Sequence, residues 1–441
     1  MTYDLIIKNG TVLTPEGRKQ TDIAVSSGKI IELGDLSGKT ALRIVDATNQ
    51  FVLPGLIDTQ VHFREPGNEH KENLEAGTKG AVLGGVTGVF EMPNTNPPTT
   101  NVEALNDKLT RMKGRAWCNY AFYIGGTPDK ATDWHKLEML PGCCGIKIFM
   151  GASTGNLLVE EDEAVEAILK KAQRRVSIHS EDNFIMKERK HIAEEGAHPR
   201  YHPIWRNKES AVSSTNRLLK IARKTGAKVH VLHVTTAEEM EILARNKDIA
   251  TVEILANHLV FTDGDYETQG TLVQMNPPIR DKENQAKLWE AVRADIVDIF
   301  GSDHAPHTLA EKALPYPQSP SGMPGVQTLV PALLDAINKG KMTLEKLVDG
   351  MNTKVAAIWN IKNKGAIKPG YDADFTIVDM NQTHTYRNAE MANISGWTPF
   401  NGMTLKGVPT HTIISGKVIM ENGQLNEALK GTGRAFEFDV N

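Results

Sequence analysis

Cysteine is scarce in this chain, whose 441 residues contain only Cys118, Cys143 and Cys144. So few thiols, odd in number, cannot build a disulfide framework, which favours a reducing compartment and predicts a cytoplasmic protein. Long apolar runs are also missing, because no stretch approaches the roughly 18 residues of a membrane-spanning helix. Residues 1–10 include Asp4 and lack the apolar core of a signal peptide. We therefore expect no association with a membrane.

An excess of positive charge is the third absence. The chain has 50 Lys and Arg against 54 Asp and Glu, a formal net charge of −4. Proteins dedicated to nucleic acids usually carry a basic excess or a basic run, and neither is found here. The expected partner is a small-molecule substrate, with no nucleic acid involved.

Helical periodicity is absent from the N-terminal segment. Alternating apolar residues predict strands at residues 3–10, 22–25 and 29–33. The same texture returns after residue 368, where residues 373–378 and 410–416 are predicted strands. We predict one small β-sandwich built from both ends of the chain, residues 1–53 and 368–441.

Between these ends, short apolar strands alternate with longer helical stretches. The predicted strands are residues 85–92, 145–150, 176–179, 229–233 and 297–301, and the clearest helices are residues 160–173 and 210–225. Such alternation is typical of βαβ units around a parallel sheet. Its length indicates an α/β fold in which residues 54–367 form a (β/α)8 TIM-type barrel.

Polar side chains recur at the ends of the barrel strands. They are Gln60, His62, Lys147, His179, His233 and Asp303. In a barrel, the carboxyl ends of the strands converge on the active site. Imidazole and carboxylate groups brought together there predict a metal site of the kind that suits Zn²⁺.

Lys147 is the unusual member of this set, because it stands inside the apolar run of residues 145–150. A buried lysine is costly unless it is paired or chemically modified. Carboxylation of its amine by CO₂ would convert Lys147 into an anionic bridge between two metal ions.

Seven short motifs surround these residues: 58–67 (DTQVHFREPG), 92–99 (MPNTNPPT), 178–181 (IHSE), 233–235 (HVT), 275–278 (MNPP), 301–307 (GSDHAPH) and 321–322 (SG). Together they resemble the signature motifs of the dihydroorotase family within the amidohydrolase superfamily. The resemblance covers almost the whole chain. It implies a metal-dependent hydrolase that reversibly cyclises N-carbamoyl-L-aspartate to (S)-dihydroorotate in pyrimidine (UMP) biosynthesis.

The resemblance also implies one or two Zn²⁺ per subunit. His62 and Asp303 would bind the more buried ion, His179 and His233 the second, and N6-carboxylated Lys147 would bridge them. Zinc activates water near neutral pH. Asp303 would take the proton of that water and pass it to the departing ring nitrogen.

Arg64 is the strongest candidate for substrate recognition. It lies two positions after His62, so along a strand it would point to the same side. Its planar guanidinium can grip a carboxylate with two bonds, and dihydroorotate carries one at carbon 6. The alternative is a structural pair of Arg64 with Glu65 or another acid.

The remaining substrate contacts are implied by resemblance alone. Asn94 and His307 would complete the carboxylate pocket. Asn276 and the backbone of Ser321 and Gly322 would contact the amide edge of the ring.

Gln60 departs from the family pattern, which usually has a His at this position. An amide oxygen is a weaker zinc ligand than imidazole. Gln60 is therefore a weak or absent ligand, and three outcomes stay open: weak binding through its oxygen, a single metal, or loss of activity. The other five metal-site residues favour retained activity.

Three functions remain in view. The favoured one is an active dihydroorotase, and the second is another cyclic amidohydrolase such as a hydantoinase, dihydropyrimidinase or allantoinase. The third is an inactive subunit that supports aspartate transcarbamoylase. Family habit suggests a homodimer. The Pro- and Gly-rich residues 310–325 predict an irregular loop, either a lid over the substrate or a static crossover.

Overall fold

An eight-stranded parallel sheet forms the centre of the computed structural model, which describes residues 2–129, 131–153 and 157–439. Its strands follow one another in chain order: β8 (Leu56–Val61), β9 (Val86–Glu91), β10 (Asn119–Gly125), β11 (Cys143–Phe149), β12 (Val176–His179), β13 (Val229–Val231), β14 (Ala250–Leu255) and β15 (Ile299–Gly301). Every strand is buried along its whole length, which explains the nearly continuous apolar runs in the sequence.

The barrel closes between its first and last strands. A parallel bridge joins Val61 to His304. Beside it, the backbone N–H of His62 donates to the carbonyl of His304 at 2.7 Å. The two predicted metal ligands His62 and Asp303 therefore lie next to the seam.

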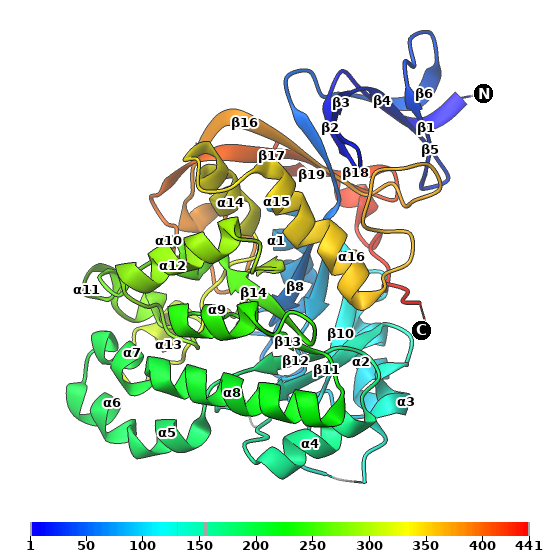
Figure 1. The fold of residues 1–441 in the computed structure, drawn as a ribbon. Helices are drawn as coiled ribbons and strands as arrows, with labels where there is room; N and C mark the ends of the chain where they lie inside the picture. The colour runs from blue at the N-terminus through cyan, green and yellow to red at the C-terminus, as the bar shows by residue number, and fades with distance from the viewer. Residues whose placement is uncertain (1, 130, 154–156, 440–441) are drawn as a thin grey trace.

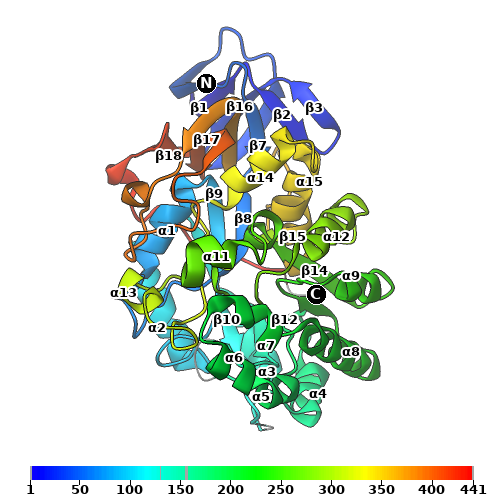
Figure 2. The same cartoon turned by 90° about the vertical axis from the view of Figure 1, so that its left-hand side faces the viewer.

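Helices surround the strands, as Figures 1 and 2 show. They are α1 (Leu74–Leu83), α2 (Val102–Met112), α3 (Trp134–Glu138), α4 (Asp162–Lys171), α5 (Asn183–Glu188), α6 (Lys190–Gly196), α7 (His202–Trp205), α8 (Lys208–Thr225), α9 (Ala237–Ala244), α10 (Ala256–Val260), α11 (Asp265–Gln269), α12 (Lys282–Arg293), α13 (Leu309–Lys312), α14 (Leu329–Asn338), α15 (Leu344–Val348) and α16 (Lys354–Trp359). None of the helices in the described part of the chain combines the length and the apolar character that a membrane crossing requires.

Two further sheets form the sandwich. One has the order β5-β4-β1-β6, from β1 (Thr2–Lys8), β4 (Asp22–Ser26), β5 (Lys29–Gly34) and β6 (Thr40–Asp46). The other has the order β19-β18-β17-β16-β7-β2-β3, from β2 (Thr11–Thr14), β3 (Gly17–Gln20), β7 (Phe51–Pro54), β16 (Phe375–Thr385), β17 (Thr404–Ile414), β18 (Lys417–Glu421) and β19 (Gln424–Leu425).

The two ends of the chain meet in the second sheet. β7 pairs antiparallel with β16, which places Pro54 opposite Phe375. Figures 1 and 2 both show the blue N-terminal strands beside the orange and red strands at one end of the molecule. The predicted fold class, a (β/α)8 barrel with a sandwich from both termini, is confirmed. The domain boundaries at 53/54 and 367/368 stay predictions, and residues 1 and 440–441 lie outside the described part.

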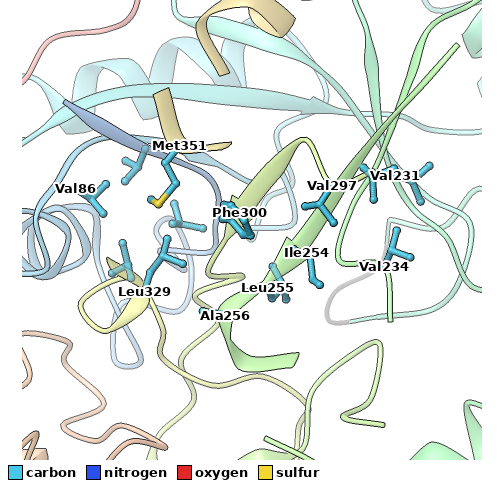
Figure 3. Packing of buried hydrophobic residues seen from close by; sticks show 14 of the residues in the cluster. Val86, Val231, Val234, Ile254, Leu255, Ala256, Val297, Phe300, Leu329 and Met351 are labelled. Atoms are coloured by element: carbon cyan, nitrogen blue, oxygen red, sulfur yellow. The ribbon is translucent and has the colours of Figure 1, made fainter. Parts of the chain in front are cut away.

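The largest apolar cluster fills the layer between strands and helices. Figure 3 shows part of it, including Phe300 of β15, Leu255 of β14 and Met351 of the π-helix η3 (Asp349–Thr353). A separate cluster combines Phe90 of β9 with Phe436 and Phe438 of the C-terminal tail. The C-terminal tail, which comes after the last sandwich strand in the chain, therefore packs against the barrel.

Candidate active site

The six predicted metal-site residues lie at the carboxyl ends of their strands. Gln60 and Lys147 are inside β8 and β11, and His179 is the last residue of β12. His62 follows β8 directly, while His233 and Asp303 come two residues after β13 and β15. Every one of these side chains is buried, and His62, at 8% exposure, is the most accessible.

Three residues of this site have a left-handed backbone conformation. Arg64, His233 and Asp303 have φ angles of 62°, 39° and 46°. Residues other than glycine rarely adopt such left-handed conformations, which persist where the surrounding structure enforces them and often mark functional positions.

His62 bridges Asn94 and Asp303. Its Nδ1 donates to Asn94 Oδ1 at 2.7 Å, so Nε2 carries the lone pair of the neutral ring. That Nε2 lies 3.0 Å from Asp303 Oδ1, which is also an acceptor. Burial lowers the pKa of His62 and so favours the neutral ring. Two buried acceptors facing each other have the donor chemistry that suits a shared cation.

Gln60 turns its amide nitrogen to the same carboxylate. Nε2 donates to Asp303 Oδ1 at 3.0 Å. The amide oxygen Oε1 is buried and has no hydrogen-bond partner among the described residues. The group facing Asp303 is therefore a donor and not a metal-binding oxygen.

A second contact between predicted metal ligands joins His179 and His233. His179 Nε2 donates to Glu181 Oε2 at 2.9 Å, so its Nδ1 carries the lone pair and lies 3.0 Å from His233 Nε2. Burial opposes ionisation of Glu181, but Arg206 and His179 hold its pKa below the usual range. Arg206 donates to both carboxylate oxygens of Glu181. A carboxylate that orients an imidazole in this way is typical of metal-ligating histidines.

Lys147 lies among these groups as a buried amine. Its Nζ has no hydrogen-bond partner in the described part of the chain and sits 4.6 Å from the ring centroid of Phe149. Burial lowers the pKa of Lys147 to about 7. Its charge lowers the pKa values of His62, His179 and His233, which places it within electrostatic reach of all three.

The donor types fit zinc, because His62 and His179 each keep one imidazole lone pair and the Lys147 amine lies within electrostatic reach of both. Among the residues described, no three His, Cys, Asp or Glu side chains converge closely enough to form a complete metal site. The Lys147 side chain ends in an amine, which in its protonated form would repel a bound metal cation. An anionic carbamate on Lys147 would supply the missing oxygen ligands.

Arg64 lies at the same end of the barrel, but it follows β8 and is not part of that strand. β8 ends at Val61, so strand alternation does not extend to Arg64, and that part of the prediction is wrong. Its side chain is held by the Pro306 carbonyl, which accepts from Nε at 3.0 Å. Glu65, considered as an alternative partner, is instead bound by Arg115 with two hydrogen bonds of 2.9 and 3.1 Å.

His307 lies directly beside this guanidinium. Its Nε2 is 3.3 Å from Nη2 of Arg64 and 3.1 Å from the backbone oxygen of Ser321. Burial lowers the pKa of Arg64 to about 10, so the group keeps its charge at neutral pH. The structure thus brings together a buried cation and an imidazole, as expected for a carboxylate pocket.

The other predicted substrate residues lie on the adjoining segments. Asn276 Oδ1 accepts from His202 Nε2 at 2.9 Å. Gly322 has a φ of 138°, and a Cβ there would lie 2.5 Å from the carbonyl oxygen of Ala305, so only glycine fits. Its N–H donates to the carbonyl of Gln274 at 2.9 Å.

Residues 310–325 pack onto the barrel in this structure. Lys312, a buried residue of this segment, donates to the carbonyls of Pro320 and Gln274 at 2.8 and 3.2 Å. His304 and Met323 form a parallel bridge. Beyond α13 the segment is irregular, as the Pro and Gly pattern predicts.

Sequence reasoning missed several residues of the site. Glu181 stands in a quoted motif but received no role, and Arg206 had no recognisable signal. Glu253, like Lys147, is a charged residue inside an apolar strand. This pattern is visible in the sequence and could have identified Glu253 as a residue of the site. Its Oε1 accepts from the backbone of His233 at 3.2 Å, and burial raises its pKa to about 8.

Comparisons with known proteins identify the relatives of this chain. The family model of the amidohydrolase family matches residues 51–419. A dihydroorotase of Pyrococcus abyssi is 36% identical over 91% of this chain and 92% of that protein. An allantoinase of Salmonella newport is 32% identical over 96% of each chain. The structure of an L-hydantoinase (dihydropyrimidinase) from Arthrobacter aurescens superposes with a TM-score of 0.94 at 27% identity, covering 100% of both chains. The chain belongs to the amidohydrolase family.

Proposed function

We propose that this protein is a dihydroorotase, which reversibly cyclises N-carbamoyl-L-aspartate to (S)-dihydroorotate. Several dihydroorotases, at 30% to 36% identity over most of the chain, support this assignment. The observation that carries it is the buried cation Arg64 beside His307 at the catalytic end of the barrel.

Arg64 separates the candidate substrates. Dihydroorotate has a carboxylate on its ring, whereas hydantoin and allantoin are uncharged. A guanidinium with 4% exposure is costly to bury without a compensating anion. The Arg64 guanidinium contacts the Pro306 carbonyl and the His307 ring, neither of which is an anion, so a substrate carboxylate would supply the opposite charge.

Zinc would be held by His62, His179, His233, Asp303 and carboxylated Lys147. When bound, the metal acts as a Lewis acid that lowers the pKa of water and polarises the ring carbonyl. For Lys147, the neutral amine would attack CO₂ and lose one proton to form the carbamate. The burial of Nζ and the lowered pKa of this amine support that step. Intact-mass measurement under native conditions tests it, since carboxylation adds the mass of one CO₂.

Asp303 would move the proton. In the hydrolytic direction it takes a proton from the attacking water and gives it to the departing ring nitrogen, and in the cyclising direction the transfer reverses. The Gln60 amide donates to Oδ1 of this carboxylate at 3.0 Å and helps to fix its orientation. Asn94, bonded to His62, and His307 would sit near the substrate carboxylate, with Asn276, Ser321 and Gly322 along the ring amide.

The substrate preference decides between dihydroorotase and the second candidate. Zinc-loaded protein is assayed with dihydroorotate, hydantoin and allantoin under the same conditions. We expect turnover of dihydroorotate to exceed that of both uncharged rings. Faster turnover of hydantoin or allantoin would transfer the assignment to a cyclic amidohydrolase of that kind, which the similarity to an allantoinase and an L-hydantoinase favours.

The assembly and the cellular location of the protein stay predictions. They comprise a cytoplasmic location, a homodimer and association with aspartate transcarbamoylase. An inactive supporting role in such a complex is the remaining alternative, and Gln60 is its only support.

A further inference from the structure

Lys71 lies at the edge of the carboxylate pocket, next to His307 and on the side of that ring away from Arg64. It belongs to the segment between β8 and α1, and its side chain is 14% exposed. Its Nζ stands between two groups of the neighbouring segment. It is 2.7 Å from Glu311 Oε1 and 3.2 Å from His307 Nδ1.

The partners of His307 fix its tautomer from both sides. A lysine ammonium can only donate, so Nδ1 of His307 accepts from Lys71. The backbone oxygen of Ser321 can only accept, so Nε2 carries the proton. Burial, Arg64, Lys71 and Lys312 together lower the pKa of His307, which keeps the ring neutral.

This tautomer determines what Arg64 can do. Because His307 Nε2 bears a hydrogen, it offers no lone pair to the Arg64 Nη2 that lies 3.3 Å away. The Nε2 hydrogen is bonded to the Ser321 carbonyl at 3.1 Å, so His307 would donate to a substrate carboxylate by sharing or giving up that bond. Together with the charged guanidinium of Arg64, such a donor would match the two oxygens of a carboxylate.

Glu311 explains how Lys71 is held in place. Its Oε2 accepts from the backbone and hydroxyl of Thr308 at 2.9 and 3.0 Å, which caps α13. The other oxygen, Oε1, forms the ion pair with Lys71. Arg64, Lys71 and Lys312 all lie within electrostatic reach of His307, and Glu311 is the acid that pairs with Lys71.

We propose that Lys71 is a specificity-determining positioning residue, which anchors Nδ1 of His307 and adds positive charge so that the pocket prefers a ring bearing a carboxylate. The inference rests on the proposed function and deepens it. It assigns the preference for an anionic ring to Lys71 acting through His307, in addition to Arg64.

The test measures binding of two probes to zinc-loaded protein by titration calorimetry. Orotate carries the ring carboxylate and uracil lacks it. The variants are Lys71→Met, which removes donor and charge, Lys71→Gln, which keeps a donor only, and Lys71→Arg, which keeps both. Lys79→Met is the matched control, because Lys79 is 39% exposed and its ion pair with Glu427 is 3.6 Å long.

We expect Lys71→Met to raise the Kd for orotate about tenfold and to leave the Kd for uracil unchanged. The Kd of Lys71→Arg for orotate should stay within about threefold of that of the original protein, and the Kd of Lys71→Gln should lie between those of Lys71→Arg and Lys71→Met. The Kd of Lys79→Met should equal that of the original protein. If Lys71→Met does not fold, the contrast between Lys71→Gln and Lys71→Arg decides in the same way.

Two results would overturn the inference. One is an unchanged orotate Kd in both uncharged variants, and the other is an equal loss of orotate and uracil binding, which indicates a merely structural role. A different result concerns the proposed function itself. If the unmodified protein binds uracil as tightly as orotate, the dihydroorotase assignment fails whatever the variants do.

Discussion

The side-chain nitrogen Nε2 of Gln60 lies 3.0 Å from Oδ1 of Asp303. His62 Nε2 lies at the same distance from the same oxygen. The Gln60 amide therefore lies next to the predicted metal ligand Asp303. It donates a hydrogen bond to Asp303 through its N–H and presents no lone pair to a metal ion there. This relationship bears directly on how many metal ions the site holds.

Replacing Gln60 with histidine should increase the zinc content. An imidazole provides a lone pair where the amide provides an N–H, so we expect Gln60→His to bind about one more ion per chain. Metal analysis after gel filtration measures this. Gln424→His, in the exposed edge strand β19, is the control and should retain the original content. Equal zinc in Gln60→His and the original protein would show that Gln60 does not limit the site.

Glu181 should support zinc binding without touching the ion. It fixes the tautomer of His179, and loss of such an outer partner typically weakens metal affinity by about 10- to 100-fold. We expect Glu181→Gln to show this loss in a competition with a chromogenic chelator. Glu188→Gln, at the exposed end of α5, should leave the affinity unchanged. Unaltered zinc affinity in Glu181→Gln would contradict the assignment of His179 as a ligand.

Arg64→Met should abolish the preference for a charged ring. Removing a charge-assisted contact with a carboxylate costs about 3 kcal/mol, so kcat/KM for dihydroorotate should drop about 100-fold. Any hydrolysis of hydantoin should persist, because that ring has no carboxylate. Arg223→Met, which removes an exposed surface pair with Asp248, controls for the loss of charge. Full activity of Arg64→Met on dihydroorotate would exclude the carboxylate role.

Much of the barrel was predictable because its strands are buried on both faces. The expected strand at residues 176–179 coincides with β12, and the helix expected at residues 210–225 lies within α8. β10 and β14 were not identified. In β14, Thr251 and Glu253 interrupt the apolar run, since their polar groups are bonded inside the barrel to His230 and Thr59.

The chemistry of the site was less accessible than its location. Strand ends indicated where His62, His179 and Asp303 converge, because the carboxyl ends of parallel strands meet at one edge. The direction of Arg64 was not derivable, since its φ of 62° breaks the alternation on which the argument relied. The orientation of the Gln60 amide depends on a carboxylate 243 residues further along the chain, and no local pattern contains that information.

The C-terminal tail should contribute to stability. Phe436 is 4% exposed and packs edge-on against Phe90, with ring centroids 5.5 Å apart. Phe436→Ala should lower the free energy of unfolding by about 3–5 kcal/mol and leave kcat unchanged. Denaturant titration measures the effect, and Leu42→Ala, at a site with 81% exposure, should shift it by less than about 0.5 kcal/mol. An equal response of the two variants would show that the tail does not stabilise the barrel.

The rate of dihydroorotate turnover is the decisive measurement for the proposed activity. Purified protein is assayed in both directions, by loss of dihydroorotate absorbance and by formation of dihydroorotate from N-carbamoyl-L-aspartate, after zinc loading and after chelation. We expect turnover in both directions that disappears with the chelator and returns with zinc. Folded, zinc-supplied protein that turns over neither compound would contradict the proposed activity.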